Sequence, residues 1–274
     1  MAKKKQNKRS KKPALTARTA DKHDLYQQSV QDAEAEASFL TRTFQKLSGR
    51  PAISLREDFC GTALLCAEWV KKRERTAVGV DLDANVLAWG VVHNLAPIGE
   101  PGNRVELRRA DVRDKVPGRF DITVALNFSY FIFRTRDEIR AYFAAVRKSV
   151  AKDGLFVLDA YGGYESWQPM EEPRRMDGFT YVWDQDEVCP IDNGVVNYIH
   201  FEFKDGTKLK RAFIYEWRLW TLPEIMELLA EAGFAKSTVY WEDGDARGEG
   251  TGVFRPKAHV GQEAAWVAYI IAQP

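Results

Sequence analysis

The chain has 274 residues, of which 45% are hydrophobic and 29% charged, proportions typical of a globular protein and not of a disordered or fibrous one. A chain of this length suits one α/β domain that carries an insertion. Residues 1–12 hold seven of the 40 Lys and Arg residues and no acid, so the rest of the chain carries 33 bases against 39 acids. Because that remainder is acidic, a protein that mainly grips nucleic-acid phosphates is disfavoured.

The cysteines and the apolar runs indicate in which compartment the protein is located and whether it binds a metal. Three cysteines, with no CxxC and no Cys/His cluster, support neither a disulfide framework nor a zinc site. No apolar stretch approaches the roughly 18–20 residues of a membrane-spanning helix. The basic start also lacks the apolar segment of a secretory signal. The sequence therefore predicts a cytoplasmic protein with no membrane partner and no metal.

The N-terminal 50 residues fall into two segments. Residues 1–20 predict a basic, disordered, solvated tail, with an arm that contacts nucleic acid as the alternative. In residues 21–50, apolar side chains recur at helical spacing, and Gly49 and Pro51 mark the end. This second segment predicts an amphipathic helical region with room for one break, and it opens a domain expected to span residues 21–274.

Short strands alternate with helices between residues 53 and 160. The predicted strands are 53–57, 77–81, 104–108, 120–127 and 154–160, and the predicted helices are 63–72, 84–95 and 137–150. This alternation predicts a parallel sheet with helices on both faces. Continuous apolar runs at 122–126 and 155–158 are expected of strands that are buried on both faces.

From residue 161 to 220 the pattern changes to apolar alternation with period two, interrupted by the turn sequences Asp192-Asn193-Gly194 and Asp205-Gly206. This pattern predicts an antiparallel β insertion with strands at 179–188, 195–204 and 208–219. A helix at 222–232 and strands at 234–241 and 264–272 are expected to follow. The glycine-rich stretch 244–252 predicts a mobile loop.

The first predicted strand–turn–helix unit carries the most informative motif, LREDFCGTA at residues 55–63. In a dinucleotide-binding frame, Phe59 and Leu64 occupy two of the three glycine positions, so hydride transfer from a nicotinamide is disfavoured. The segment resembles motif I of the class I S-adenosylmethionine-dependent methyltransferases, with Glu57 as the acid and Cys60-Gly61-Thr62 as the core. Phe59 stands where that motif has its first glycine, which predicts a negative φ there or a shifted turn.

Acids at the ends of the next two predicted strands extend the resemblance. Asp81 follows the second strand and Asp111 the third, and carboxylates there can accept hydrogen bonds from a ribose and from an adenine amino group. Each acid alone is more often a cap or loop residue, and either Asp81 or Asp83 could cap the next helix. The resemblance covers residues 50–160 and implies a Rossmann-like α/β sheet, mostly parallel with an antiparallel last strand, and S-adenosylmethionine as the cofactor. The implied cofactor-binding residues are Glu57, Phe59, Gly61, Asp81, Leu82, Asp111, Val112 and Asn127.

The end of the fourth predicted strand indicates the kind of methyl acceptor. In this family it faces the transferred methyl group, and here it reads Asn127-Phe128-Ser129-Tyr130, without the prolines of enzymes that methylate nucleobase amino groups. Together with the β insertion, this pattern is similar to small-molecule N- and O-methyltransferases such as the glycine and amino-sugar N-methyltransferases. We therefore expect methyl transfer to N or O of a small-molecule acceptor. The alternatives are a nucleic-acid or protein methyltransferase that uses the basic tail and a non-catalytic cofactor-binding scaffold.

The insertion at 161–220 is expected to line the acceptor pocket, and it could also form a homodimer contact. In related enzymes the N-terminal segment, here residues 21–50, folds over the cofactor as a lid. His200 could act as a general base, although a lone histidine on a strand is more often structural, and Tyr130 could instead pack in the core. No catalytic residue is assigned. The candidate acceptor residues are Tyr26, Tyr130, Tyr161, His200 and Trp217.

Overall fold

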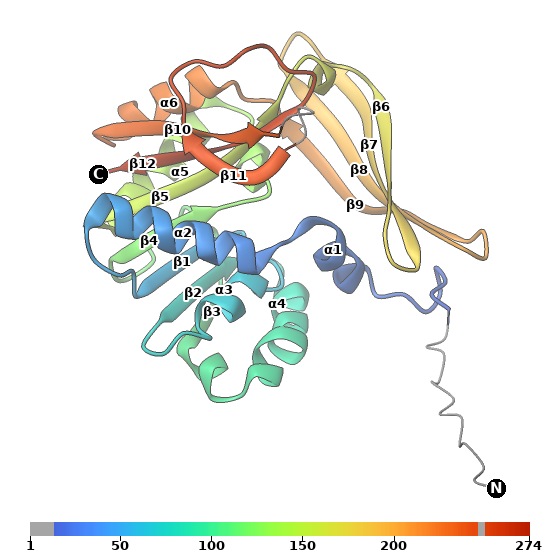
Figure 1. Cartoon of the computed structure of the whole chain (residues 1–274), viewed down its shortest axis with the longest axis horizontal. Coiled ribbons are helices and arrows are strands. Elements are labelled where there is room, and N and C mark those ends of the chain that lie inside the picture. Colours follow the sequence, from blue (N-terminus) through green and yellow to red (C-terminus); the bar gives the residue numbers. More distant parts are fainter. Residues whose placement is uncertain (1–13, 246–249) are drawn as a thin grey trace, which may run out of the picture.

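Residues 14–245 and 250–274 are described by the computed structural model, and they contain two sheets that lie beside each other (Figure 1). The larger sheet has eight strands in the order β11-β10-β12-β5-β4-β1-β2-β3. Its strands are β1 (Ser54–Asp58), β2 (Thr76–Asp81), β3 (Val105–Arg109), β4 (Phe120–Ala125), β5 (Val150–Gly162), β10 (Lys236–Gly244), β11 (Gly250–Pro256) and β12 (Trp266–Gln273).

The direction of the strands confirms the predicted fold class. Strands β1 to β5 pair in parallel, whereas β12 runs antiparallel to both β5 and β10. The prediction of a mobile loop over 244–252 is wrong at both ends of that stretch. Strand β10 extends to Gly244, and β11 begins at Gly250 and pairs antiparallel with β10. The Glu242 carboxylate accepts the N–H of Gly252 at 2.6 Å across this hairpin. The centre of the predicted loop, residues 246–249, lies outside the described residues.

Helices cover both faces of the large sheet (Figure 1). On one face, α2 and α3 bury Phe44 and Trp69 against β1, and on the other face α5 and α6 bury Phe143 and Leu228 against β5. The helices are α1 (Lys22–Val30), α2 (Ala33–Ser48), α3 (Leu64–Trp69), α4 (Ala84–Gly90), α5 (Arg136–Ser149) and α6 (Leu222–Glu231). Shorter helical turns are η1 (Val91–Leu95), η2 (Ala96–Ile98), η3 (Glu100–Arg104), η4 (Ser129–Ile132) and η5 (Glu165–Trp167). None of the helices in the described ranges has the length and apolar character that a bilayer crossing needs.

The N-terminal region contains two helices, preceded by residues that contact the second sheet. The helical segment expected at 21–50 has the one break that the expectation allowed, because Asp32 leaves helical geometry and accepts the N–H of Ala35 as the cap of α2. Residues 1–13 of the predicted tail lie outside the described residues. Leu15 and Ala20, however, pack against the second sheet, and the Ala17 N–H donates to Thr207. The prediction of a solvated tail therefore does not hold for these three residues.

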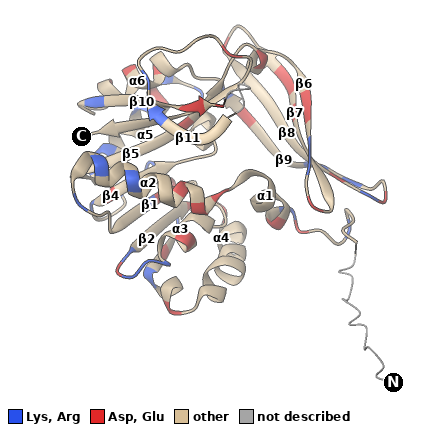
Figure 2. Cartoon of the chain, in the orientation of Figure 1, with Lys and Arg blue, Asp and Glu red and all other residues tan. Residues whose placement is uncertain are grey.

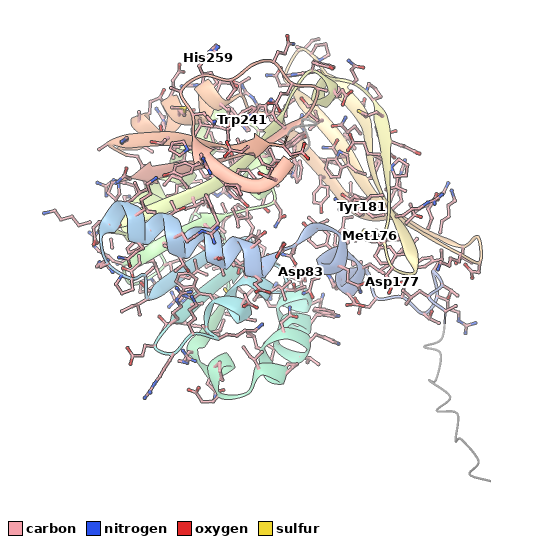
Figure 3. The ribbon with its side chains drawn as sticks, viewed as in Figure 1. Asp83, Met176, Asp177, Tyr181, Trp241 and His259 are labelled. Atoms are coloured by element: carbon pink, nitrogen blue, oxygen red, sulfur yellow. The ribbon has the colours of Figure 1, made fainter. Side chains whose placement is uncertain are left out.

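The second sheet is the insertion between β5 and α6. It is antiparallel throughout, in the order β6-β7-β8-β9, with β6 (Met170–Arg175), β7 (Phe179–Cys189), β8 (Gly194–Phe203) and β9 (Lys208–Arg218). The predicted insertion is confirmed, but strand β6 was missed because its sequence MEEPRR has no apolar alternation and contains a proline. Tyr181 of β7 lies on the side of this sheet that faces α1, as Figure 3 shows.

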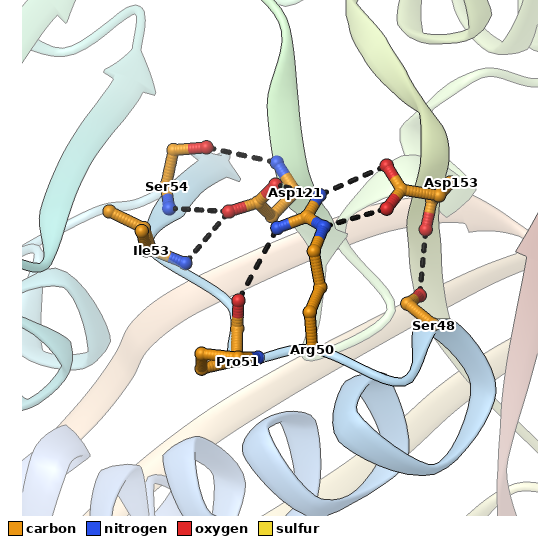
Figure 4. A network of polar contacts seen from close by, with 7 residues as sticks. All are labelled: Ser48, Arg50, Pro51, Ile53, Ser54, Asp121 and Asp153. Atoms are coloured by element: carbon orange, nitrogen blue, oxygen red, sulfur yellow. Dashed lines mark hydrogen bonds and ion pairs between the residues drawn. The ribbon is translucent and has the colours of Figure 1, made fainter.

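A network of ion pairs closes the amino-terminal edge of the large sheet (Figure 4). The Arg50 guanidinium donates to Asp121 at 2.6 Å and to Asp153 at 2.7 Å, and the Asp121 carboxylate also accepts the N–H groups of Ile53 and Ser54. Burial opposes ionisation of Asp121, but these donors hold the pKa of its carboxyl below the usual value. The network fixes the end of α2 to the start of β1, β4 and β5, at the edge opposite the candidate site.

Candidate functional site

The carboxyl ends of β1, β2 and β3 are joined by hydrogen bonds, so the three predicted acids lie at one edge of the sheet. The Gly61 N–H donates to the Asp81 carboxylate at 2.8 Å, which links the turn after β1 to the end of β2. The Ala110 N–H donates to the Asp81 carbonyl at 3.1 Å, which links the turn before Asp111 to the same strand. Glu57 lies in β1 and Asp81 ends β2, and each carboxylate lies within electrostatic reach of the other.

Phe59 has a left-handed backbone conformation of the kind that favours glycine. Its φ is +56°, so the expectation of a negative φ at this position is wrong. The ring packs against Phe133 and Tyr142, with centroid distances of 6.0 and 5.7 Å, and this contact offsets the strain of a left-handed aromatic residue. A Cβ placed on Gly61 would meet no atom within 4 Å, so the turn borders open space.

The turn after β1 is supported by a buried ionic network that sequence reasoning missed. The Arg56 side chain is 1% exposed and donates to the Asp58 carboxylate at 2.7 Å, to the Ser149 hydroxyl and to the Val112 carbonyl. The Tyr142 hydroxyl donates to the other Asp58 oxygen at 2.9 Å. Burial raises the pKa of Asp58, and the attraction of Arg56 opposes that rise. Arg56 inside the predicted strand 53–57, with Asp58 directly after it, was the available sign of this network.

The acids at this edge have different surroundings. Glu57 is buried, accepts the Cys66 N–H at 3.1 Å, and has a pKa that burial raises to about 7. Asp81 accepts the Asp83 N–H, and Asp83 accepts the Asn85 N–H as the cap of α4, which resolves the capping alternative in favour of Asp83. Leu82, between them, has an exposed side chain.

Asp111 and Val112 are held within their own loop. The Arg113 guanidinium donates to Asp111 at 2.7 Å, and this hydrogen bond lowers the pKa of the carboxyl below its usual value. Val112 is buried, and its carbonyl is occupied by Arg56. The Asp111 carboxylate thus lies at the predicted edge of the sheet, where it forms an ion pair with Arg113.

A buried acid on β5 shapes the end of β4. The two Asp159 oxygens accept the N–H groups of Asn127 and Phe128 at 2.7 and 2.9 Å, and both of those residues have left-handed φ values, +56° and +57°. Burial raises the pKa of Asp159 to about 7. Tyr130 donates its hydroxyl to the Asp159 carbonyl and is fully buried, so it belongs to the core and does not line the cavity described next.

A cavity of about 530 Å³ lies where the two sheets meet, bounded by α1, the start of α2, the ends of β4 and β5, and the inner face of the β6–β9 sheet. Aromatic side chains form much of its wall: Tyr26, Phe128, Tyr161, Tyr181, Trp183, Tyr215, Trp217, Trp266 and Tyr269. Among the described residues, its acidic residues are Glu36, Asp159, Glu165, Glu172 and Glu242, and Arg174 is its one Lys or Arg. Acidic residues also gather on β6 and on the first turn of α2 (Figure 2).

Of the predicted acceptor residues, Tyr26, Tyr161 and Trp217 line this cavity together with Asn127. His200, which was also a predicted acceptor residue, does not line the cavity. Its Nδ1 accepts the Arg211 N–H at 2.7 Å, so its Nε2 carries the proton and donates to Asp184 at 2.9 Å. The ring fills a register shift between β8 and β9, which favours the structural role over the general base.

Helix α1 connects the two sheets beside the cavity. Its cap Asp21 accepts from the Trp89 indole at 2.8 Å, and Gln27 donates to Thr62 in the turn after β1 at 2.6 Å. On the other side, Tyr26 shares a hydrogen bond with Tyr215 of β9, and Arg174 of β6 donates to the Ser29 carbonyl. The helix therefore contacts both the motif turn and the insertion.

Comparison with solved structures places this arrangement among known folds. A methyltransferase dependent on S-adenosylmethionine from Clostridium acetobutylicum aligns with a TM-score of 0.68 at 16% identity, over 92% of this chain and 96% of the other. CalS10, an amino pentose methyltransferase from Micromonospora echinaspora, gives 0.65 at 18% identity over 92% and 96%. The sugar N-methyltransferase KedS8 from a Streptoalloteichus species gives 0.61 at 18% identity over 100% and 99%. The chain shares the fold of these methyltransferases. No family sequence model and no curated protein sequence matches it.

In this methyltransferase fold, the cavity opens at the same edge of the sheet as the motif turn. Glu36 connects the two regions, because its carboxylate lines the cavity and lies within electrostatic reach of Glu57 and Asp159. Sequence reasoning also missed Glu36, whose position in the first turn of α2 is typical of an ordinary capping acid. Among the described residues, no group of three or more His, Cys, Asp or Glu side chains is placed to hold a metal ion.

Proposed function

We propose that the protein is an S-adenosylmethionine-dependent methyltransferase that methylates a nitrogen or oxygen atom of a small-molecule acceptor. The observation that carries the proposal is the common edge at which the Gly61–Asp81 hydrogen bond, the acids of β1 and β2 and the cavity meet. The shared fold with CalS10 and KedS8, an amino pentose and a sugar N-methyltransferase, supports a small-molecule acceptor.

The residues at this edge suit the cofactor chemically. Glu57 and Asp159 are buried carboxylates and Glu36 is a half-buried one; no described Lys or Arg neutralises them, and burial raises the pKa of each. Such a site favours a ligand with positive charge, and S-adenosylmethionine carries an ammonium and a sulfonium group. The open space above Gly61 leaves room beside the turn. The residues proposed to hold it are Glu57, Phe59, Gly61, Asp81, Leu82, Asp111, Val112 and Asn127.

When bound, the cofactor would supply a methyl group made electrophilic by its sulfonium sulfur, which a nitrogen or oxygen atom of the acceptor would attack. The chain's own contribution is to position the acceptor and to exclude water. Alignment of two reactants can contribute about 7–11 kcal/mol to lowering a barrier. The aromatic wall is suited to positioning an acceptor. Helix α1, which is hydrogen-bonded to Thr62 and Tyr215, is suited to excluding water, and α1 and α2 together act as the lid.

The features that suggested the two alternatives, a non-catalytic scaffold and a nucleic-acid or protein methyltransferase, do not favour them in the structure. Phe59, the reason to consider a scaffold without activity, places its ring in the core and leaves the Gly61 turn open. The basic tail, the reason to consider a nucleic-acid methyltransferase, belongs to residues 1–12, and the cavity itself is acidic and ill-suited to phosphate. A cytoplasmic location is supported by the free thiols of Cys60 and Cys66, and a homodimer through the β6–β9 sheet remains part of the proposal.

The test is calorimetric binding of S-adenosylhomocysteine with two matched variants. Asp81→Asn removes a charge proposed to contact the ribose and should weaken binding by about 1.5–3 kcal/mol, roughly 10- to 150-fold in Kd. Asp83→Asn removes the same charge two residues away and keeps a good helix cap, so its Kd should equal that of the wild type. Absence of binding to the wild type, or equal Kd values for both variants, would refute the proposed cofactor site.

A further inference from the structure

The cavity carries more negative charge than the proposed cofactor can balance. The described part of its wall has five acidic residues and one arginine, and that arginine donates to the Ser29 carbonyl and stacks 5.0 Å from the Tyr181 ring. S-adenosylmethionine, with one carboxylate, an ammonium and a sulfonium, has a net charge of +1. If all five acids are ionised, an excess of negative charge remains, and it disfavours an acceptor that carries a phosphate or carboxylate.

Glu36 lines the cavity with a carboxylate that has no polar partner among the described residues. No hydrogen bond or ion pair joins it to another residue in the part of the chain that the structure describes, whereas Asp159 accepts two backbone N–H groups. Burial, together with the nearby Glu57, Asp159 and Asp32 carboxylates, raises the pKa of Glu36 to about 8. The Tyr26 and Tyr269 phenols also lie within electrostatic reach of it. This half-buried carboxylate therefore lies among acids and phenols and lacks a cation.

The aromatic wall supplies the other half of a cation site. The rings of Tyr161, Trp183, Tyr215 and Trp217 form one cluster: Tyr215 lies 4.4 Å from Trp217, and Trp183 lies 6.0 Å from Tyr215 and 6.4 Å from Tyr161, between ring centroids. Clustered aromatic faces attract an ammonium group, and the attraction is strongest where water is excluded. A neutral alcohol gains nothing comparable from the same faces.

We infer that the acceptor is a small amine that enters the cavity as a cation, that the aromatic cluster surrounds its ammonium group, and that Glu36 binds this group and accepts its proton. This inference rests on the proposed function and names its substrate class. An ammonium nitrogen has no free electron pair, so it must lose a proton before it can attack a methyl carbon. The proton moves from nitrogen to a Glu36 oxygen, giving a neutral amine and a neutral carboxylic acid, and it later leaves to solvent. A carboxyl with a pKa of about 8 takes such a proton more readily than an ordinary one.

Four probes of one shape separate charge from size: benzylamine, benzyltrimethylammonium, benzyl alcohol and benzoate, titrated into the S-adenosylhomocysteine complex of the full chain. Both cations should bind at least about tenfold more tightly than the alcohol, and benzoate more weakly still. Glu36→Gln should remove most of the preference for cations. Glu34→Gln, the same change at an exposed position of the same helix turn, should leave it intact.

Calorimetry in buffers of different ionisation enthalpy tests the proton role directly. Benzyltrimethylammonium has no proton to lose, so any proton released when it binds near pH 7.5 comes from the protein. The wild type and Glu34→Gln should release a fraction of a proton from the carboxyl at Glu36, and Glu36→Gln should release distinctly less. Equal release by Glu36→Gln would overturn the assignment to this residue.

The outcomes keep the inference and the proposed function apart. Two results would overturn the amine inference while the methyltransferase proposal stands, provided that S-adenosylhomocysteine binds. In the first, benzyl alcohol or benzoate binds with the same affinity as the two cations; in the second, neither cation binds measurably. If S-adenosylhomocysteine fails to bind, the proposed function fails. The four probes are then titrated into the free protein, where a preference for cations would support the cation site and its absence would overturn it.

Discussion

Replacement of Arg56 by methionine tests whether the buried network beneath the motif turn is held by charge pairing. The change removes the donors to Asp58, Ser149 and the Val112 carbonyl while keeping most of the side-chain volume. Asp58 then keeps only the Tyr142 donor in a site where its own side chain is fully buried. Removing one partner of a buried ion pair costs about 3–5 kcal/mol. We expect Arg56→Met to lower the free energy of unfolding by this amount.

The double variant Arg56→Met/Asp58→Asn separates pairing from packing. An asparagine amide can still accept the Tyr142 hydroxyl but leaves no buried charge, so the double variant should recover all but about 1–2 kcal/mol of the lost stability. Urea unfolding followed by tryptophan fluorescence measures both values. The single variant should also gain stability relative to the wild type as pH falls from 8 to 5, because protonation removes the stranded charge. Equal stability of the single and double variants would refute the argument.

Three further predictions concern stability. Asp121→Ala should lower the free energy of unfolding by about 2–4 kcal/mol at pH 7, because it leaves two backbone N–H groups without their acceptor and removes one of the two carboxylates that Arg50 binds. Since the pKa of Asp121 is lowered in the folded state, this loss should shrink as pH falls through that pKa in urea titrations. Phe59→Gly should cost only about 1–2 kcal/mol, because relief of backbone strain offsets part of the lost ring packing, and a cost above about 4 kcal/mol would contradict a strained φ. Glu36, Glu57 and Asp159 have raised pKa values, so the folded state binds more protons than the unfolded state between about pH 5 and pH 8. The melting temperature of the free protein should therefore fall across that range, less so in Glu36→Gln, and a flat profile would contradict these buried acids.

The centre of the large sheet could be predicted because strands β4 and β5 are buried on both faces. Continuous apolar runs in β4 and β5 leave little choice of structure, and their alternation with helices fixes parallel pairing. The missed strands lack this pattern: β6 is polar with a proline, and β11 is rich in glycine. Both are edge strands, which pairing with one neighbour stabilises regardless of their own pattern.

The candidate site was predictable where backbone geometry depends on a local motif, as at Gly61 and Asp81. It was not predictable where a residue acts through distant neighbours. Asp159 lies in an apolar run on β5 but holds the end of β4, and Glu36 is an ordinary helix-start acid until the β6–β9 sheet folds against it. Neither role follows from spacing along the chain, because each depends on contacts between elements far apart in sequence.

At the edge where the cavity opens, four residues that are not glycine, namely Phe59, Ala63, Asn127 and Phe128, have φ values between +55° and +57°. The turn shape that other chains secure with glycine is secured here by what lies beneath it: the aromatic core under Phe59 and the Asp159 carboxylate under the end of β4. A signature written as a row of glycines records only one of the two ways to build this loop. Proteins that use the other way will be recognised by their backbone geometry sooner than by their letters.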